Sequence, residues 1–195
     1  MFNYKKFENF FQKKTNIFLI FFLFLCFQLF YSFLFPSYED TWYWKTVEEL
    51  DFYQGYTFDA FDNNILQKVY PLIANYRMNL DVGGYLLLAH DFPNHYFKGN
   101  YTMLTRPLYP ILVNLVARPL HLISDSYSLT FIAGLLVNFI LFFFTVYLFF
   151  LLVRKLISFR VAFLSSILLI FSPFTHTWLI QPETNIFGIF VVIFS

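Results

Sequence analysis

The stretch that decides the fold is LTFIAGLLVNFILFFFTVYLFFLLV, residues 129–153, which contains no charged side chain. Two further apolar runs, 17–35 and 161–180, also lack Asp, Glu, Lys and Arg. A helix needs about 20 apolar residues to cross the ~30 Å hydrocarbon core of a bilayer. Within lipid, backbone N–H and C=O groups must pair inside the segment, and this requirement selects helices. The three runs therefore predict an all-α integral membrane protein that crosses the bilayer several times.

The overall composition agrees with a membrane protein. Hydrophobic residues make up 58% of the chain and charged residues only 13%, whereas a soluble domain has about 25% charged residues. The net charge of +1 provides no basic surface for a nucleic acid, so we expect no nucleic-acid partner. Membrane lipid is the partner that the apolar runs imply.

Two clusters of basic side chains predict the orientation of the chain. One cluster precedes the first run, and the other separates the second run from the third: Lys5, Lys6, Lys13 and Lys14, and Arg154, Lys155 and Arg160. The positive-inside rule assigns both clusters to the cytoplasm. A single crossing after Lys14 then puts the long segment before the second run outside, and the second run returns to the cytoplasm at Arg154. The charge asymmetry and the number of crossings therefore agree.

These crossings predict four parts: a cytoplasmic N-terminus (1–15), a transmembrane signal anchor (16–35), an extracytoplasmic loop (36–125) and transmembrane helices (126–195). The anchor is expected to stay uncleaved, because it ends in aromatic residues and has no small-residue cleavage site. The last apolar stretch has only twelve residues, 184–195, which is too short to span. We therefore expect the chain to be the N-terminal part of a longer protein, or a truncated product, with the last helix incomplete.

The loop over 36–125 is too long to be structureless and too rich in aromatic residues to be disordered. Within it, Asp81–His90 predicts an amphipathic helix with Asp81 at its N-cap. Its apolar side is formed by Tyr85, Leu86, Leu88 and Ala89. The loop is thus expected to carry helices that lie beside the membrane.

A second helix is predicted over the apolar stretch Ile111–Ile123, which is shorter than a membrane span and is interrupted by Arg118-Pro119, with Pro107 and Pro110 at the start of the helix. If this stretch crossed the bilayer, the basic residues after the second run would lie outside. We therefore expect an interfacial or re-entrant helix on the outer face, with an ordinary membrane helix as the alternative.

Three polar residues of the predicted outer face have side chains suited to group transfer. A carboxylate such as that of Asp81 can act as a general base, although it can equally serve only as a helix cap. Arg106 carries planar donors that fit a phosphate, and its alternative role is an anchor at phospholipid headgroups. Glu183 follows the third run on the same side, either at this site or as a solvated loop acid. No metal site is predicted, because metal-ligand spacing is absent among His90, His95, His121 and His176.

The order of these elements resembles the N-terminal part of the GT-C superfamily of glycosyltransferases, multi-pass enzymes that take a sugar from a polyprenyl-phosphate carrier. The resemblance rests on three motifs and their order: D-x-x-x-Y-x-x-x-A from Asp81, R-P-L-Y-P from Arg106, and Ser172-Pro173 followed by Pro182-Glu183. It covers nearly the whole chain. The fold it implies is a multi-pass bundle with a large first outer loop and juxtamembrane helices.

The resemblance also implies a site at the outer membrane face. Members of the family carry a catalytic Asp in the first outer loop, which by position is Asp81. Glu39 and Asp40 are the alternatives, since in many members the acid lies sooner after the first helix. Arg106 would bind the donor phosphate, and three residues would lie near donor and acceptor: Tyr85, Tyr109 and Glu183. The implied partner is a polyprenyl-phosphate-linked sugar, with no certain cofactor and a divalent metal left open.

Two other classes of function stay open from the sequence. The first is a non-catalytic multi-pass subunit or scaffold, in which 36–125 forms an extracytoplasmic binding surface. The second is a fragment of a transporter, which is disfavoured because no apolar run carries the charged residues typical of an ion pathway.

Overall fold

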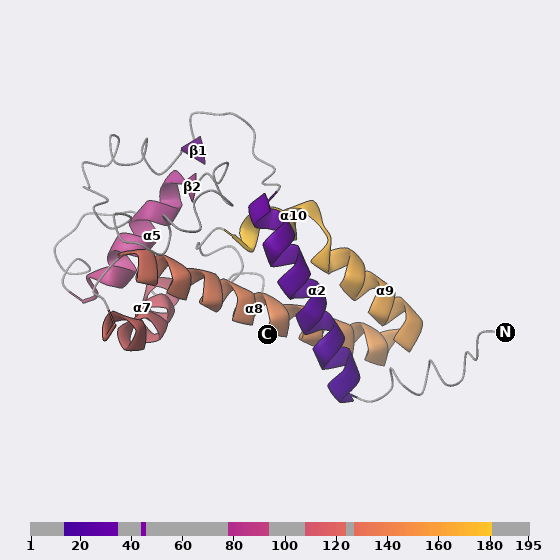
Figure 1. Ribbon diagram of the computed structural model, residues 1–195. Coiled ribbons are helices and arrows are strands. Elements are labelled where there is room, and N and C mark those ends of the chain that lie inside the picture. Colours follow the sequence, from indigo (N-terminus) through magenta and orange to yellow (C-terminus); the bar gives the residue numbers. More distant parts are fainter. Residues whose placement is uncertain (1–13, 35–43, 46–77, 94–107, 124–126, 181–195) are drawn as a thin grey trace.

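The computed structural model describes residues 14–34, 44–45, 78–93, 108–123 and 127–180. Within these ranges the chain forms six helices and one pair of two-residue strands (Figure 1). The elements are α2 (Lys14–Leu34), β1 (Trp44–Lys45), β2 (Met78–Asn79), α5 (Leu80–His90), α7 (Leu108–His121), α8 (Tyr127–Leu156), α9 (Phe159–Ile170) and α10 (Pro173–Trp178). The predicted helical class is therefore confirmed for the described part of the chain.

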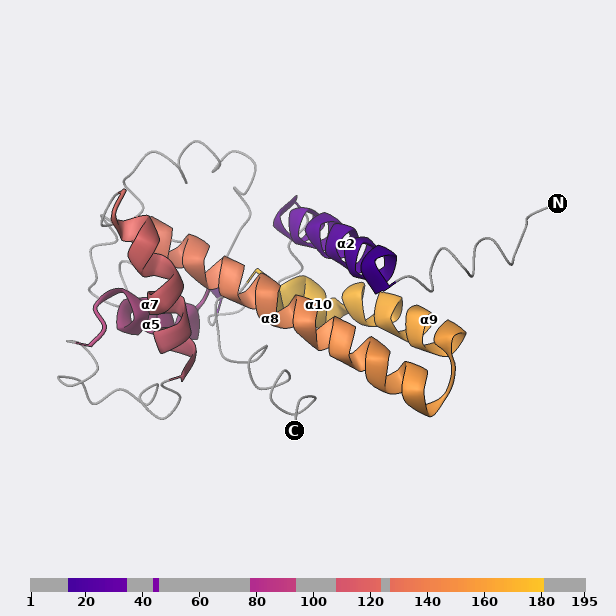
Figure 2. The ribbon, with the colours of Figure 1, turned by 90° about the horizontal axis from the view of Figure 1, so that it is seen from below.

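Helix α8 organises the arrangement. It contains 30 residues, which makes it ~45 Å long, well beyond the ~30 Å of a hydrocarbon core. Among the residues that the structure describes, it is the one helix long and apolar enough to cross a membrane, over Leu129–Leu156. Helices α5 and α7 gather at its N-terminal end, and α2 and α9 lie along its C-terminal half (Figures 1 and 2).

Aromatic rings fill the space between α2, α8 and α9. The ring of Phe21 meets Phe150 edge-on at a centroid distance of 5.5 Å and stacks near Phe163 at 6.1 Å. At the edge of this cluster the half-exposed Phe18 contacts Phe143 edge-on at 4.4 Å. Edge-to-face pairs are favoured because the positive rim of one ring faces the negative face of the other. Part of the large phenylalanine content thus forms one buried core.

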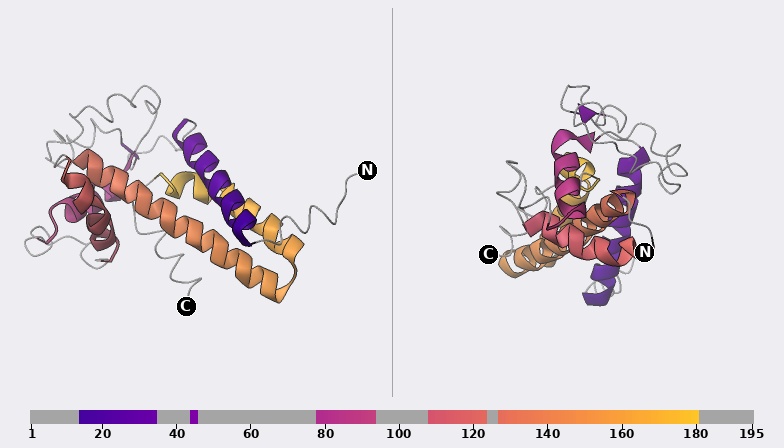
Figure 3. Two further views of the ribbon diagram at one scale, coloured as in Figure 1. Left: turned by 60° about the horizontal axis from the view of Figure 1, so that its bottom comes forward. Right: turned by 90° about the vertical axis from the view of Figure 1, so that its left-hand side faces the viewer.

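The third apolar run does not form the continuous helix that the sequence predicts over 161–180. Helix α9 ends at Ile170, and α10 begins at Pro173 after a sharp change of direction (Figure 3, left). Ser172 is extended and caps α10 by accepting a hydrogen bond from the Thr175 N–H at 3.2 Å. Proline disfavours a helical conformation in the residue before it, so the Ser172-Pro173 pair ends one helix and starts another.

Helices α5 and α7 form a second core with the N-terminal part of α8. The predicted helix over 81–90 is confirmed, and its predicted apolar side is buried: Tyr85, Leu86, Leu88 and Ala89. The helix begins at Leu80, so Asp81 lies in its first turn instead of at the N-cap. Three fully buried alanines, Ala89, Ala117 and Ala133, let the three helices approach closely.

The second predicted helix corresponds to α7, which continues through Arg118-Pro119 to His121. Proline has no N–H to donate to the carbonyl four residues earlier, and here that loss falls in the last turn. Pro110 lies in the first turn, where the N–H has no partner within the helix in any case.

The short strands join two parts of the segment between α2 and α5. β1 pairs antiparallel with β2, with Trp44 opposite Asn79 and Lys45 opposite Met78. β2 leads directly into α5. A segment ten residues beyond the end of α2 is thereby held beside the start of the helix that contains Asp81.

Candidate functional site

Of the seven buried polar side chains on α2, α8 and α10, five lie on α10 or form a hydrogen bond with it, within runs that the sequence marks as apolar: Gln28, Ser32, Asn138, Thr175 and His176. We call this set the polar layer. A polar group buried without a partner costs about 1–3 kcal/mol. Each member of the layer has a hydrogen-bond partner.

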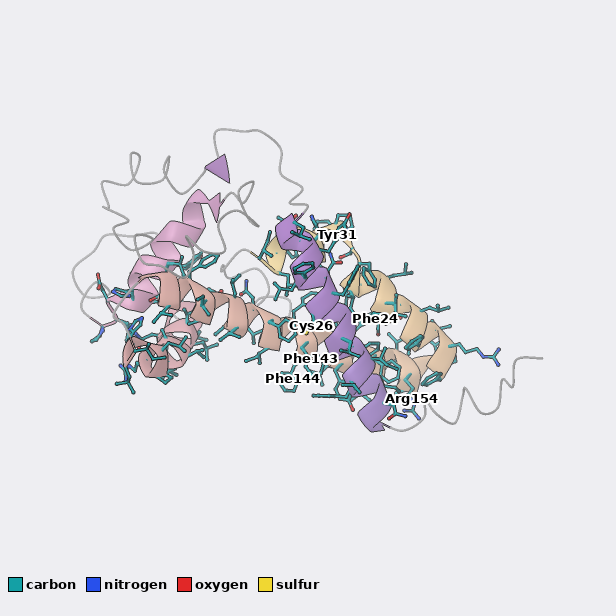
Figure 4. The ribbon with its side chains drawn as sticks, in the orientation of Figure 1. Phe24, Cys26, Tyr31, Phe143, Phe144 and Arg154 are labelled. Carbon is teal, nitrogen blue, oxygen red and sulfur yellow. The ribbon has the colours of Figure 1, made fainter. Side chains whose placement is uncertain are left out.

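His176 connects α10 to α2. Its Nδ1 lies 3.0 Å from Ser32 Oγ and 3.5 Å from Gln28 Nε2. Which of these groups donates depends on the tautomer of the imidazole. The ring of Tyr31 approaches the imidazole at a centroid distance of 5.5 Å (Figure 4). The buried imidazole therefore holds α10 against the C-terminal end of α2.

Asn138 connects three helices from the middle of α8. Its Oδ1 accepts a hydrogen bond of 2.6 Å from the Tyr109 hydroxyl of α7. Its Nδ2 donates to the carbonyl oxygen of Trp178 at 3.1 Å. That carbonyl belongs to the last turn of α10, where the final four carbonyls lack partners within the helix. One amide thus joins the core around α5 and α7 to the polar layer.

Two of the predicted site residues, Tyr85 and Tyr109, are brought together. Their rings meet edge-on at a centroid distance of 6.0 Å, and both side chains are almost fully buried. Both belong to the core between α5, α7 and α8. In the described part of the chain they therefore pack the helix that contains Asp81 against its neighbours.

The remaining predicted residues are described less fully. Asp81 lies in the first turn of α5, and its backbone position is all that the structure describes of it. Glu39, Asp40, Arg106 and Glu183 lie outside the described residues. The three candidate acids of the first loop are nevertheless close in sequence to the paired strands: Glu39 and Asp40 lie five and four residues before β1, and Asp81 lies two residues after β2.

A second polar cluster, which the sequence reasoning missed, joins α5, α7 and α8. His90 Nδ1 and His121 Nε2 lie 2.9 Å and 3.0 Å from the hydroxyl oxygen of Thr130, and the two rings are 4.9 Å apart. A hydroxyl has one proton, so with neutral rings it donates to one and accepts from the other. Within the described ranges, no three His, Cys, Asp or Glu side chains come close enough to hold a metal ion.

A pattern in the sequence could have indicated the polar layer. Gln28, Asn138 and His176 are polar interruptions of apolar runs, and such residues in membrane segments often mark functional sites. Because these residues carry no formal charge, charge patterning in the apolar runs does not reveal them.

The polar layer fixes the positions of α2, α8 and α10 relative to one another. Through its hydrogen bond with Tyr109, Asn138 also connects the layer to α7, which shares a core with α5. Its hydrogen bonds join side chains and backbone carbonyls within the protein, so on the described geometry the layer is structural and holds these helices together. Comparison with protein-family models, with curated proteins and with solved structures finds no match to the chain.

Proposed function

We propose that the chain is a glycosyltransferase of the GT-C type, or the N-terminal part of one, that moves a sugar from a polyprenyl-phosphate carrier to an acceptor at the outer membrane face. The observation that carries the proposal is the position of α5. The helix with Asp81 in its first turn packs on the end of α8 that lies opposite Arg154 and Lys155. A base is needed there, because the hydrocarbon tail of such a donor stays in the bilayer while its sugar lies outside.

The outward faces of three helices support a multi-pass arrangement. Large apolar side chains are exposed along each of them: Leu19, Phe22, Leu23, Phe27 and Phe30 on α2, Leu136, Ile140 and Phe144 on α8, and Leu164 and Leu168 on α9. Soluble monomers rarely expose contiguous apolar surface of this extent. Lipid is the environment in which such faces are stable, so α2, α8 and the α9–α10 pair are proposed to enter the bilayer together.

The basic residues support the proposed orientation. Arg154 and Lys155 end α8, and Arg160 follows at the start of α9. Helix α2 begins at Lys14, at the same end of the bundle (Figure 4). The positive-inside rule then favours a cytoplasmic N-terminus and an extracytoplasmic segment over 36–125.

Cysteine labelling tests this topology. In a Cys26→Ser background, we expect Ser37→Cys to react with an impermeant maleimide in intact cells, and Ile157→Cys to react only after permeabilisation. Ile157 is exposed at the α8–α9 turn, and it is preferable to Ser158, whose side chain caps α9. Reaction of both cysteines from the same side would contradict the orientation.

The proposed reaction is a single displacement. The Asp81 carboxylate takes the proton of the acceptor hydroxyl or amine. The acceptor atom then attacks the anomeric carbon of the sugar, and the bond from that carbon to the lipid phosphate oxygen breaks. The lipid phosphate leaves with the electron pair of this bond, and Arg106 balances its charge.

Replacing Arg106 by Lys distinguishes an enzyme from a scaffold. The positive charge stays, but the planar fork that holds two phosphate oxygens is lost. We expect the donor concentration for half-maximal transfer to rise about tenfold, which corresponds to one charge-assisted hydrogen bond, with normal insertion. Arg160→Lys, in the first turn of α9, is the matched control and should change nothing. An unchanged donor dependence in the Arg106 variant would leave that residue as a headgroup anchor.

A non-catalytic subunit or scaffold is the second candidate. The observation that favours it is the polar network itself, since Tyr109, Asn138 and His176 bond within the protein. A scaffold of this kind would tolerate substitution of Asp81 and Arg106 equally well, and would show no sugar transfer.

A further inference from the structure

The ends of three helices meet at a pair of imidazoles. His90 is the last residue of α5, His121 is the last residue of α7, and Thr130 lies in the first turn of α8 (Figure 1). His90 Nδ1 lies 2.9 Å and His121 Nε2 lies 3.0 Å from the hydroxyl oxygen of Thr130. Two ring nitrogens from different helices therefore converge on one oxygen atom of a third helix.

These three atoms have the spacing of ligands around one divalent metal ion. Zinc binds imidazole nitrogen at about 2.0–2.1 Å, so two of its ligands lie roughly 3.0 Å apart at octahedral angles and roughly 3.4 Å apart at tetrahedral angles. The two N···O distances of 2.9 Å and 3.0 Å are close to the octahedral value. Two imidazoles on one zinc ion have centroids roughly 4.5–5.2 Å apart, and the two rings are 4.9 Å apart.

The surroundings of the pair favour a cation. Thr130 is fully buried, whereas both imidazoles are partly exposed and in reach of solvent. The C-terminal ends of α5 and α7 each contribute a partial negative charge, and the N-terminal end of α8 contributes one partial positive charge. Arg118 precedes His121 on α7, but its Nε donates to Asn114 Oδ1 at 3.0 Å, one turn further from the pair.

We propose that His90, His121 and Thr130 form a zinc site that joins α5, α7 and α8, with water completing the coordination. Imidazole nitrogen is a common ligand of zinc, and the filled d shell of the ion imposes no single geometry. Among the residues that the structure describes, no third His, Cys, Asp or Glu lies beside the pair, so the Thr130 hydroxyl is the third and weakest ligand. Binding requires these side chains to rotate but not the helices to move.

The role of this zinc ion is structural. It holds the C-terminal end of α5, whereas Asp81 lies in the first turn of that helix. An ion that binds the folded site and not the unfolded chain stabilises the fold by an amount that grows with the logarithm of its concentration. The zinc site goes beyond the transferase proposal and does not depend on it.

Metal titration of the full chain tests the site. The chain is purified in detergent with a tag that lacks histidine, in a Cys26→Ser background, so that neither tag nor thiol binds the ion. We expect Zn²⁺ to raise the midpoint of thermal unfolding progressively as its concentration rises. Co²⁺ should bind at one ion per chain with visible absorption bands, and Zn²⁺ should remove these bands by displacing it.

Two substitutions remove a metal ligand and keep a hydrogen bond to Thr130. In His90→Asn an amide lies near the position of Nδ1, and in His121→Gln an amide lies near the position of Nε2. Each variant should bind Co²⁺ at least about tenfold more weakly, since losing even an outer-shell partner of a metal costs about 10–100-fold in affinity. His176→Asn is the matched control, because its amide can still bond to Ser32, and it should bind Co²⁺ like the parent chain.

Two results would overturn the proposal. The first is a parent chain that binds no Co²⁺ and gains no thermal stability in millimolar Zn²⁺, which would leave the three side chains as a hydrogen-bonded link alone. The second is equal Co²⁺ affinity in the parent chain and both ligand variants, which would place the ion elsewhere. If one ligand variant does not fold, the other carries the same expectation, because each removes one of the two imidazoles.

Discussion

Asp81→Asn is expected to give a chain that inserts normally and transfers sugar about 10²–10⁴-fold more slowly, the usual loss for one well-placed general base. Asparagine keeps the size of the side chain and removes the proton acceptor. Asp81 lies in the first turn of α5, where a carboxylate stabilises a helix by only about 0.3–1 kcal/mol. The measurement is sugar transfer from a polyprenyl-phosphate donor in native membranes, with the change made in the native gene.

Asp91→Asn is the matched control for that experiment. Asp91 follows the last turn of the same helix, so the substitution makes the same chemical change at the opposite end of α5. We expect it to retain activity. Turnover like that of the parent chain in Asp81→Asn would transfer the role of base to Glu39 or Asp40. Equal losses in the two variants would indicate a general effect on the fold of α5.

Asn138→Leu is expected to lower the free energy of unfolding by about 2–4 kcal/mol. Leucine has a similar volume, so packing changes little, but the hydrogen bonds to the Tyr109 hydroxyl and the Trp178 carbonyl are both lost. Each loss of a partner at a buried site costs about 1–2 kcal/mol. The measurement is equilibrium unfolding in mixed detergent micelles, followed by loss of helix signal.

Two further variants separate this link from a simple polarity effect. Thr145→Val removes another buried polar group of α8, but its hydroxyl bonds to the Leu141 carbonyl of the same helix, so a small change is expected. Tyr109→Phe removes one of the two bonds of Asn138 and should cost about half as much as Asn138→Leu. Equal losses of stability in the Thr145 and Asn138 variants would contradict this expectation. They would mean that hydrogen bonds between helices stabilise the fold no more than a hydrogen bond within one helix.

The sequence predicted the helices that hydropathy and periodicity can reveal. Helices α8 and α5 agree with their predicted ranges within a few residues, because an apolar run and an N-terminal acid are local signals. The prediction of one continuous helix over the third run, 161–180, was wrong for a reason that is also local. Hydropathy counts apolar side chains and overlooks the backbone, so Ser172-Pro173 was interpreted as part of a family motif instead of as the end of a helix.

The polar contacts between helices could not be predicted from the sequence. Gln28 and His176 are 148 residues apart, and neither residue belongs to a spacing pattern that predicts the other. The pairing depends on how α10 turns back toward α2 after the break, which is a property of tertiary packing. Tyr85 could be assigned to the apolar face of its helix, but its contact with Tyr109 depends on the crossing of α5 and α7.

The short length of α9 has a consequence for the lipid around the protein. Its 12 residues extend only ~18 Å, so beside this helix a ~30 Å hydrocarbon layer is longer than its protein wall by ~12 Å. Bilayers respond to such a mismatch by thinning locally. Under the proposed placement, α10 lies at the outer end of this thinned zone. There the headgroup of a lipid-borne molecule would lie closest to the level of the bilayer centre.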